Sequence, residues 1–331
     1  METHAVVFTG VSRVEFKRIE MPEPGPKHVQ VRTAYSTISA GTKGWCLRNL
    51  FSCAATPYPC VPGYQRVGTI TAIGSEVKDW RVGERAMATV GRCPGEVRPF
   101  WGAHAGVINT PASEIYQIPP GADEVDASAA AVAQVGYNAA YRATIASGDW
   151  VVIYGDGLIG QCGAQAARSR GAKVVLPGHR DDRLALAARH STDAVVNTHR
   201  QDVVAAVRRI VGAETVPVLI DTVQTEESQK QYIELLRFRS GQIVYSGFSP
   251  QKAWADMAVF HQRELTTHFI SGWSGQRMEA TLALMGEGKL RVRPLVTHLV
   301  PASRGPEMYR MILEKNQPFT GITLDWTGED T

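Results

Sequence analysis

Three glycines spaced as Gly-x-Gly-x-x-Gly, Gly155, Gly157 and Gly160, carry the clearest chemistry in this 331-residue sequence. An apolar run precedes them and an alanine-rich helical pattern follows, which is the strand–turn–helix context of a dinucleotide-binding turn. The first glycine permits the tight turn, the second lets the backbone approach a pyrophosphate, and the third lets the helix pack close to the strand. The helix N-terminus then offers unpaired N–H groups to the phosphates. The motif therefore predicts a dinucleotide site that includes Leu158 and Ile159; the alternative is an ordinary glycine-rich turn.

The end of the next expected strand indicates which dinucleotide binds. A site for NAD places Asp or Glu there, about 20 residues after the glycines, to accept hydrogen bonds from the ribose 2′-hydroxyl. This chain has Gly178, His179 and Arg180 instead. A glycine leaves room for a 2′-phosphate, Arg180 can pair with it through its planar guanidinium, and His179 can add a second donor. We therefore expect NADP(H). The alternative is that both cations are solvated and that Asp181 or Asp182 contacts the ribose of NAD(H).

Strand and helix patterns alternate from about residue 126 to residue 275. The expected strands cover residues 151–154, 173–176, 194–196, 217–221, 242–246 and 267–271. Six strands in this alternation fit one doubly wound parallel sheet. Val223 and Ser246 are also expected to contact the cofactor.

The region before residue 122 has a different residue pattern. Short β-rich runs, among them residues 29–35, 67–74 and 85–90, are separated by turn residues, which suggests a small barrel or sandwich. An amphipathic helix is expected at 277–286, and the closing run 321–326 is expected to return to the first domain. We therefore divide the chain into a first domain of residues 1–122 and 276–331 and a second of residues 123–275.

Composition and charge narrow the class of protein. The length fits about two domains, and 44% hydrophobic and 20% charged residues describe an ordinary globular protein. A net charge of +3 without a basic run favours neither a nucleic-acid nor a membrane partner. The first residues resemble a strand rather than a signal peptide, and the five cysteines are odd in number and scattered, as free thiols in a reducing compartment would be. We expect a cytoplasmic protein.

Several segments of the first domain match the motifs of one enzyme superfamily, in order. Residues 62–70 stand where alcohol dehydrogenases carry Gly-His-Glu-x-x-Gly-x-Val, and residues 73–77 and 82–85 follow as the Val-Gly-Ser-x-Val and Val-Gly-Asp-Arg-Val segments. The chain thus resembles the medium-chain dehydrogenase/reductase superfamily over nearly its full length. The resemblance implies an α/β protein with a GroES-like β-rich catalytic domain and an inserted Rossmann domain. It also implies a small-molecule substrate, an active site in the cleft between the domains, and a homodimer or homotetramer.

The zinc ligands of that superfamily are replaced. Ser39 and Tyr64 stand at the positions of a ligand Cys and a ligand His, and the third ligand position falls at about Val135. These side chains cannot form a tetrahedral site of thiolate and imidazole ligands. The structural zinc lobe needs four closely spaced cysteines, and only Cys93 stands in that segment. We therefore expect no metal. Cys46, Cys53 and Cys60, spaced by seven, match no zinc-binding pattern and have no assigned role.

Residues 38–42 resemble the Ile-Ser-x-Gly-Thr-Glu segment of a subgroup that includes bacteriochlorophyllide dehydrogenases and polyol-type dehydrogenases. The closing run 321–326 supports this likeness. Lys43 replaces the final Glu of that segment, so the substrate of the subgroup does not carry over.

Without zinc, hydrogen-bond donors must stabilise the developing oxyanion. Tyr64 is the first candidate for proton transfer, because an ammonium at Lys43 would lower the pKa of its phenol. His104 is the rival, because an imidazole titrates near neutral pH. Ser39 and Thr42 can donate hydrogen bonds to a substrate hydroxyl or to the cofactor ribose.

Three functions fit these residues. The leading hypothesis is a zinc-independent NADP(H)-dependent oxidoreductase that interconverts an alcohol and a ketone of a sugar, cyclitol or natural product. The second is an enoyl or quinone reductase, although such relatives usually carry Asn-Pro-x-Asp-x-x-x-Arg where this chain has residues 38–44. The third is an NADPH-binding protein without catalysis. The remaining histidines, such as His190, His199 and His261, are expected to lie away from the substrate cleft.

Overall fold

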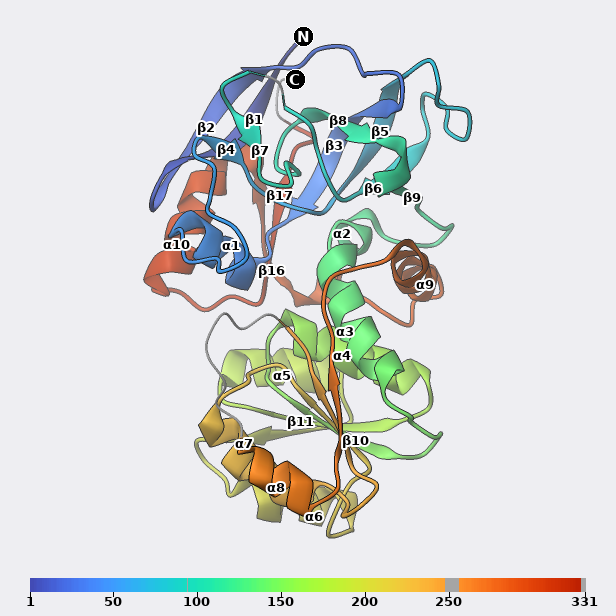
Figure 1. The fold of residues 1–331 in the computed structure, drawn as a ribbon, viewed down its shortest axis with the longest axis vertical. Helices are drawn as coiled ribbons and strands as arrows, with labels where there is room; N and C mark the ends of the chain where they lie inside the picture. The colour runs from blue at the N-terminus through green and yellow to red at the C-terminus, as the bar shows by residue number, and fades with distance from the viewer. Residues whose placement is uncertain (94, 248–255, 329–331) are drawn as a thin grey trace. The chain divides into compact units, whose positions relative to one another are not determined.

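The computed structural model describes residues 1–93, 95–247 and 256–328, and the chain forms two compact units (Figure 1). Unit 1 comprises Met1–Ala131 and Val296–Thr331, and unit 2 comprises Val132–Leu295. In the described part of the chain, no helix is long and apolar enough to cross a membrane.

The boundaries between the units differ from the predicted division in two segments. Residues 123–131, expected in the second domain, belong to unit 1, where the Ser128 hydroxyl lies 2.8 Å from that of Thr37. Residues 276–295, expected in the first domain, belong to unit 2, where Gln165 Nε2 donates to the Arg291 carbonyl at 2.9 Å. Long-range side-chain contacts of this kind leave no local sequence signal.

Unit 1 is built on two sheets. One has the strand order β2-β1-β4-β7, and the other has the order β16-β17-β3-β5-β6-β9, with β8 also paired to β3. The closing run returns to this unit, as expected, because β17 pairs antiparallel with β3. The elements are β1 (Glu2–Gly10), β2 (Arg13–Glu20), β3 (His28–Thr37), α1 (Ala40–Leu47), β4 (Cys60–Val61), β5 (Arg66–Ile73), β6 (Arg85–Ala88), β7 (Arg98–Pro99), β8 (Val107–Pro111), η1 (Ala112–Glu114), β9 (Ile115–Gln117), α2 (Glu124–Ala127), β16 (Val296–Pro301), η4 (Ala302–Arg304), α10 (Gly305–Glu314) and β17 (Gly321–Asp325).

Unit 2 is a six-stranded parallel sheet with helices on both faces (Figure 1). Its strand order is β12-β11-β10-β13-β14-β15, and each expected strand is present with ends shifted by at most two residues. The elements are α3 (Ala130–Arg142, which begins in unit 1), β10 (Trp150–Tyr154), α4 (Leu158–Ser169), β11 (Lys173–Gly178), α5 (Asp181–His190), β12 (Ala194–Asn197), α6 (Val203–Val211), β13 (Val218–Asp221), α7 (Glu226–Tyr232), η2 (Ile233–Leu235), β14 (Gln242–Tyr245), α8 (Met257–Gln262), β15 (Thr266–Phe269), α9 (Gly275–Gly286) and η3 (Arg293–Leu295).

The continuous apolar run of β10 explains why this sheet is covered on both sides. Val151 and Ile153 pack into a cluster with side chains of α3, α4 and α5, whereas Val152 and Tyr154 pack into a second cluster with α6, α7 and α8. Successive strand residues face opposite sides, so a strand buried on both faces needs apolar residues at every position. The carboxyl ends of β10, β11 and β13 therefore meet at one edge, where doubly wound sheets bind their ligands.

Candidate functional site

The glycine turn after β10 has the geometry that a dinucleotide needs. Gly155 has φ 118°, and a Cβ there would lie 2.2 Å from the Thr222 hydroxyl oxygen, so no other residue fits without a shift. Gly157 is the N-cap of α4, and a Cβ on it would meet nothing closer than the Arg183 Nη1 at 3.8 Å. The backbone at the start of α4 is thus open to a ligand, and the helix directs its free N–H groups toward that space.

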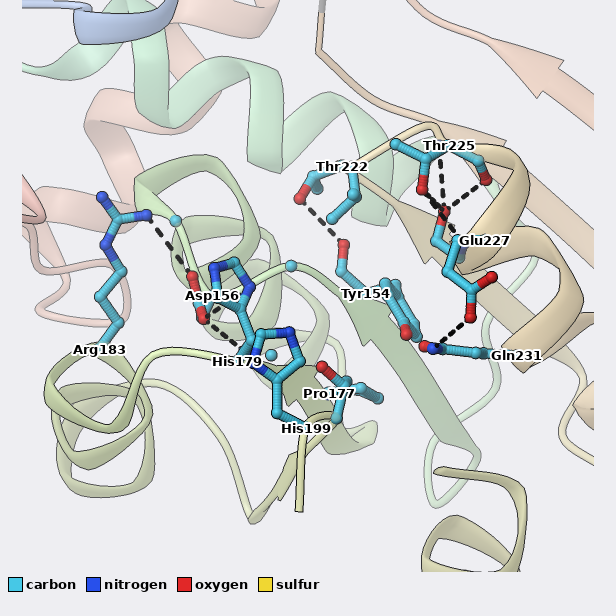
Figure 2. Close-up of a pocket in the computed structure, with 16 residues that line it drawn as sticks. Tyr154, Asp156, Pro177, His179, Arg183, His199, Thr222, Thr225, Glu227 and Gln231 are labelled. Atoms are coloured by element: carbon cyan, nitrogen blue, oxygen red, sulfur yellow. Dashed lines mark hydrogen bonds and ion pairs between the residues drawn. The ribbon is translucent and has the colours of Figure 1, made fainter. Parts of the chain in front are cut away.

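A cavity of about 340 Å³ opens at this turn within unit 2 (Figure 2). Its lining comes from the carboxyl ends of β10, β11, β12 and β13 and from α5 and α7. The lining residues are Tyr154, Gly155, Asp156, Gly157, Pro177, Gly178, His179, Arg183, Thr198, His199, Thr222, Val223, Thr225, Glu227, Ser228 and Gln231.

Asp156, the variable residue between the first two glycines, organises one wall of this pocket (Figure 2). Its carboxylate is buried, and Oδ2 accepts the backbone N–H groups of His179 and Arg180, each at 2.9 Å. Its Oδ1 lies 3.5 Å from the Arg183 guanidinium. A Cβ on Gly178 would lie 2.6 Å from the Asp156 Cβ. The space that a side chain at position 178 would fill thus holds Asp156, and Gly178 itself lines the pocket.

Arg183, rather than Arg180, is the arginine that lines the pocket. Arg180 is the N-cap residue of α5, and its Nε lies 3.6 Å from the Asp182 carboxylate, outside the lining. Arg183 lies in the first turn of α5, whereas Arg180 is the extended N-cap residue before it, and only the Arg183 side chain lines the cavity. Burial lowers the pKa of the Arg183 guanidinium, the charge of Arg180 lowers it further, and Asp156 opposes both effects.

Two histidine rings flank the same wall. His179 lines the pocket, as expected, and its ring centroid lies 5.1 Å from that of His199, which lines it as well (Figure 2). His199 was expected to lie away from the substrate cleft, and it was not among the residues expected to contact the cofactor. The β12 strand brings it to the pocket because its carboxyl end pairs with that of β11.

The other expected cofactor residues lie around the turn at different depths. Val223 lines the pocket, whereas Leu158, Ile159 and Gly160 begin helix α4 behind the lining. Ser246 is fully buried, its carbonyl accepts a hydrogen bond from Gln224, and it is not part of the lining.

A second cluster lies wholly within unit 1, where Ser39, Thr42 and Tyr64 meet. Ser39 precedes α1 and Thr42 lies in its first turn, so their hydroxyls share one end of that helix. Burial raises the pKa of the Tyr64 phenol, and hydrogen bonds with the Ser39 and Thr42 side chains oppose that rise. The structure therefore brings three of the predicted residues together.

Lys43 joins this cluster in a different way from the one expected. Its Nζ lies over the ring face of Tyr64, 4.3 Å from the centroid, and 3.6 Å from the ring centroid of Trp101. The expectation that an ammonium at Lys43 brings the phenol pKa toward neutrality is wrong, because burial of Tyr64 dominates and raises that pKa. Burial also lowers the pKa of Lys43 itself to about 7.

His104 is part of the interior of unit 1. The residue is fully buried, its Nδ1 lies 2.9 Å from the Ser36 hydroxyl, and a Cβ on Gly63 would lie 2.7 Å from its ring. Burial and the charges of Lys43 and Arg66 lower the pKa of His104 to about 3. The expectation that this imidazole titrates near neutral pH is therefore wrong.

The residues at the expected metal positions do not fit a zinc ion. Ser39 and Tyr64 offer hydroxyls that hydrogen-bond to each other, and Val135 has no atom that could bind a metal ion. The Lys43 amine lies against the Tyr64 ring. Among the described residues, no three His, Cys, Asp or Glu side chains are grouped as metal ligands. Burial raises the pKa of Cys93 to about 12, which disfavours the thiolate that zinc binds.

The sequence did not single out Asp156 or Arg183, and it did not place Trp101 against Lys43. Asp156 stands inside the glycine motif. An acid at this position, together with Gly178 at the end of the next expected strand, was a usable signal. Arg183 could have been found from its spacing of three residues from Arg180 on an expected helix. Trp101 had no sequence signal, because its place over Lys43 depends on the folded sheet.

Comparison with known proteins provides evidence on the family and the fold of this chain. Residues 25–120 match the family described as alcohol dehydrogenase GroES-like domain, and residues 159–287 match the family described as zinc-binding dehydrogenase. The chain is 27% identical over 339 residues to 2-desacetyl-2-hydroxyethyl bacteriochlorophyllide A dehydrogenase of Cereibacter sphaeroides, covering 98% of this chain and 99% of that protein. It is 25% identical over 332 residues to a sorbitol dehydrogenase of Halalkalibacterium halodurans, covering 93% and 95%.

A solved structure from Sinorhizobium meliloti, described as a zinc-binding dehydrogenase bound to NADP, has the same fold. The TM-score is 0.83 at 22% identity, with 98% of this chain and 99% of that chain covered.

Proposed function

The chain belongs to the medium-chain dehydrogenase/reductase superfamily and is an alcohol-dehydrogenase-like oxidoreductase. From this premise we propose that it is a zinc-independent, NADP(H)-dependent enzyme that interconverts an alcohol and a ketone. The observation that carries the proposal is the hydroxyl cluster of Ser39, Thr42 and Tyr64, in which Ser39 and Tyr64 stand where the superfamily resemblance places metal ligands.

The pocket of unit 2 favours the phosphorylated cofactor. Arg183, His179 and His199 line it, and a guanidinium pairs with a phosphate through charge-assisted hydrogen bonds. In an NAD site, a carboxylate accepts hydrogen bonds from the ribose. The Asp156 carboxylate is not available for this, because it already accepts two backbone N–H groups and faces Arg183. Glu227, which also lines the pocket, accepts a hydrogen bond from Gln231 at 3.0 Å.

When bound, the nicotinamide supplies the hydride and the protein manages the proton. In the reducing direction the phenol of Tyr64 donates its proton to the substrate oxygen, and in the oxidising direction the phenolate takes it back. Ser39 and Thr42 stabilise that phenolate, because their hydrogen bonds favour the ionised form. His104 stays neutral and buried and holds Ser36 in place.

The substrate class is proposed from likeness alone. The relatives include a 2-desacetyl-2-hydroxyethyl bacteriochlorophyllide A dehydrogenase and a sorbitol dehydrogenase. We therefore propose a sugar, a cyclitol or a natural-product carbonyl compound.

One experiment separates the proposed activity from its alternatives. Purified protein treated with a chelator is supplied with NADPH or NADH, and oxidation of the cofactor is followed with a panel of ketones and a panel of enones. Ketone-dependent oxidation of NADPH after chelation supports the proposal. Oxidation with enones alone would establish C=C reduction instead, and NADPH binding without turnover on either panel would indicate a non-catalytic protein.

A further inference from the structure

Lys43 places an amine inside the core of unit 1 with no polar partner. The residue is 0% exposed, and its Nζ accepts or donates no hydrogen bond within the described chain. Helix α1 turns it inward together with Cys46 and Leu47. A buried ammonium without a partner is costly, so some other interaction must compensate for its lost hydration.

Aromatic ring faces provide that interaction. The Nζ lies 3.6 Å from the ring centroid of Trp101, 4.3 Å from that of Tyr64 and 5.8 Å from that of Phe100. Such positions over the negative face of an aromatic ring attract a cation, most strongly when water is excluded.

The titratable groups packed around Lys43 and its aromatic neighbours carry no negative charge at neutral pH. Cys46 on α1 and Cys60 on β4 act on Lys43, and burial raises the pKa of both thiols, so they stay protonated. Burial also raises the pKa of Tyr309 on α10 well above its ordinary value, and it lowers that of His104 to about 3. Among these groups, none supplies an anion to the Lys43 amine.

The backbone holds the indole of Trp101 over the amine at a cost. Trp101 has φ 69°, a left-handed conformation that is strained for a bulky residue. Its carbonyl accepts the Gly91 N–H, and its ring meets the Tyr64 ring edge to face at 5.6 Å between centroids. Strain of this kind persists where the surrounding structure enforces it, often at functional sites.

We propose that Lys43 is a positioning residue that supplies a reversible positive charge to Tyr64 through the face of its ring, in place of the charge that a metal ion gives related sites. This inference rests on the proposed function, in which Tyr64 transfers the proton. A cation on the ring face favours the phenolate over the phenol, so it offsets part of the burial that raises the pKa of Tyr64 without bringing that pKa to neutrality. The effect is present while Lys43 is protonated and is lost as the pH rises through about 7.

The kinetic test compares two replacements of Lys43 with a surface control. Ketone reduction by NADPH is measured from about pH 5.5 to 9 for wild type, Lys43→Met, Lys43→Arg and Lys17→Met, which removes an exposed lysine of the same unit. Wild type and Lys17→Met should lose activity as the pH rises through about 7. Lys43→Met should lose about tenfold in kcat below pH 7 and show no such transition, with NADPH affinity unchanged. Lys43→Arg, which stays charged, should keep the activity into the alkaline range.

A second readout needs no substrate. Because the chain has seven tryptophans, the emission of Trp101 is taken as the difference between wild type and Trp101→Phe. That emission should change with a midpoint near pH 7 in the wild type and should stay flat in Lys43→Met.

A flat Trp101 signal in the wild type, or a Lys43→Met enzyme that keeps the wild-type pH profile, would overturn the inference. Equal losses in both Lys43 variants at every pH would show a packing role and would overturn it too. If no carbonyl compound is reduced by the wild type, the proposed function fails, and the Trp101 titration by itself decides whether Lys43 carries the reversible charge.

Discussion

Asp156 and Arg183 share the wall of the cofactor pocket as a pair of opposite charges. The Asp156 carboxylate already holds the turn after β11 through two backbone N–H groups, so it partly compensates the Arg183 guanidinium at 3.5 Å. A phosphate that enters the pocket therefore meets an arginine fixed in place but not fully neutralised. Preorganisation of this kind lowers the entropy lost on binding.

Replacing each arginine in turn tests which one contacts the 2′-phosphate. Arg183→Ala should weaken NADPH by roughly 1.5–3 kcal/mol, the worth of a hydrogen bond to a charged group, and should leave NADH nearly unchanged. Arg180→Ala is the matched control and should have a small effect, because its side chain faces Asp182 outside the lining. Titration calorimetry with both cofactors measures the difference. A larger loss in Arg180→Ala would return the role to the residue that the sequence indicated.

Tyr64→Phe tests the proton donor. The ring volume and its contacts with Lys43 and Trp101 are preserved, and the cofactor pocket lies in unit 2, so NADPH affinity should not change. The value of kcat should fall by roughly 10²–10⁴, as for loss of a positioned general acid.

His104→Asn provides the comparison for Tyr64. Because the His104 pKa is about 3, the imidazole is neutral over the working range, and its loss should reduce thermal stability without changing the shape of the pH–rate profile. A Tyr64→Phe enzyme with nearly wild-type kcat, together with an inactive and stably folded His104→Asn enzyme, would assign the proton to His104.

At the scale of elements, the turn from β11 to α5 positions the cofactor wall. Gly178 ends the strand beside Asp156, and His179 and Arg180 follow with their N–H groups on that carboxylate. The turn is thus fixed by a side chain from the neighbouring β10–α4 turn rather than by its own residues. Two sequence segments about 20 residues apart act as one element.

Gly178→Ala should push these two turns apart. The new Cβ would lie 2.6 Å from the Asp156 Cβ, so the free energy of unfolding should fall by about 1–3 kcal/mol, and NADPH should bind more weakly. Adding Asp156→Gly to Gly178→Ala should recover part of the stability, because the clash is removed. Gly10→Ala is the control: its Cβ would meet only the Arg13 side chain at 3.6 Å. Chemical denaturation measures all of these, and equal effects of the two alanines would contradict the clash.

At the scale of the whole molecule, Lys43 makes stability depend on pH. Its folded pKa of about 7 lies below the ordinary value of 10.5, so the unfolded chain binds more protons between these two values. The free energy of unfolding therefore rises with pH over that window, and the full cost of the buried charge is present below about pH 7.

Lys43→Met should accordingly be more stable than the wild type at pH 6, by about 2–4 kcal/mol. The difference should shrink as the pH rises above 7 and vanish near 10.5. Urea denaturation of both proteins at several pH values measures it. A stability difference that does not depend on pH would show that Lys43 has an ordinary pKa.

Metal content is a further property of the whole protein. With Ser39, Tyr64 and Val135 at the expected ligand positions, the purified protein should contain no stoichiometric zinc, and chelators should leave its activity intact. Elemental analysis that finds about one zinc per chain, with activity lost on chelation, would contradict the zinc-independent mechanism.

The sequence by itself determined the parts of this protein that depend on local pattern. The continuous apolar runs specified the central parallel strands β10 and β13, because a strand covered on both faces needs apolar residues throughout. The Gly155 motif specified the tight turn after β10, because the conformation and close contacts of Gly155 exclude a side chain. The replacement of ligand residues at Ser39 and Tyr64 was also visible without a structure.

Only the tertiary structure decided which side chains share a space. Asp156 occupies the space that a side chain at position 178 would fill, and Arg183 rather than Arg180 lines the pocket. Lys43 lies on the ring face of Tyr64 rather than beside its hydroxyl, because α1 turns its buried side toward the core of unit 1. Spacing along a chain limits which elements meet, whereas burial and the direction of each Cβ determine which atoms touch.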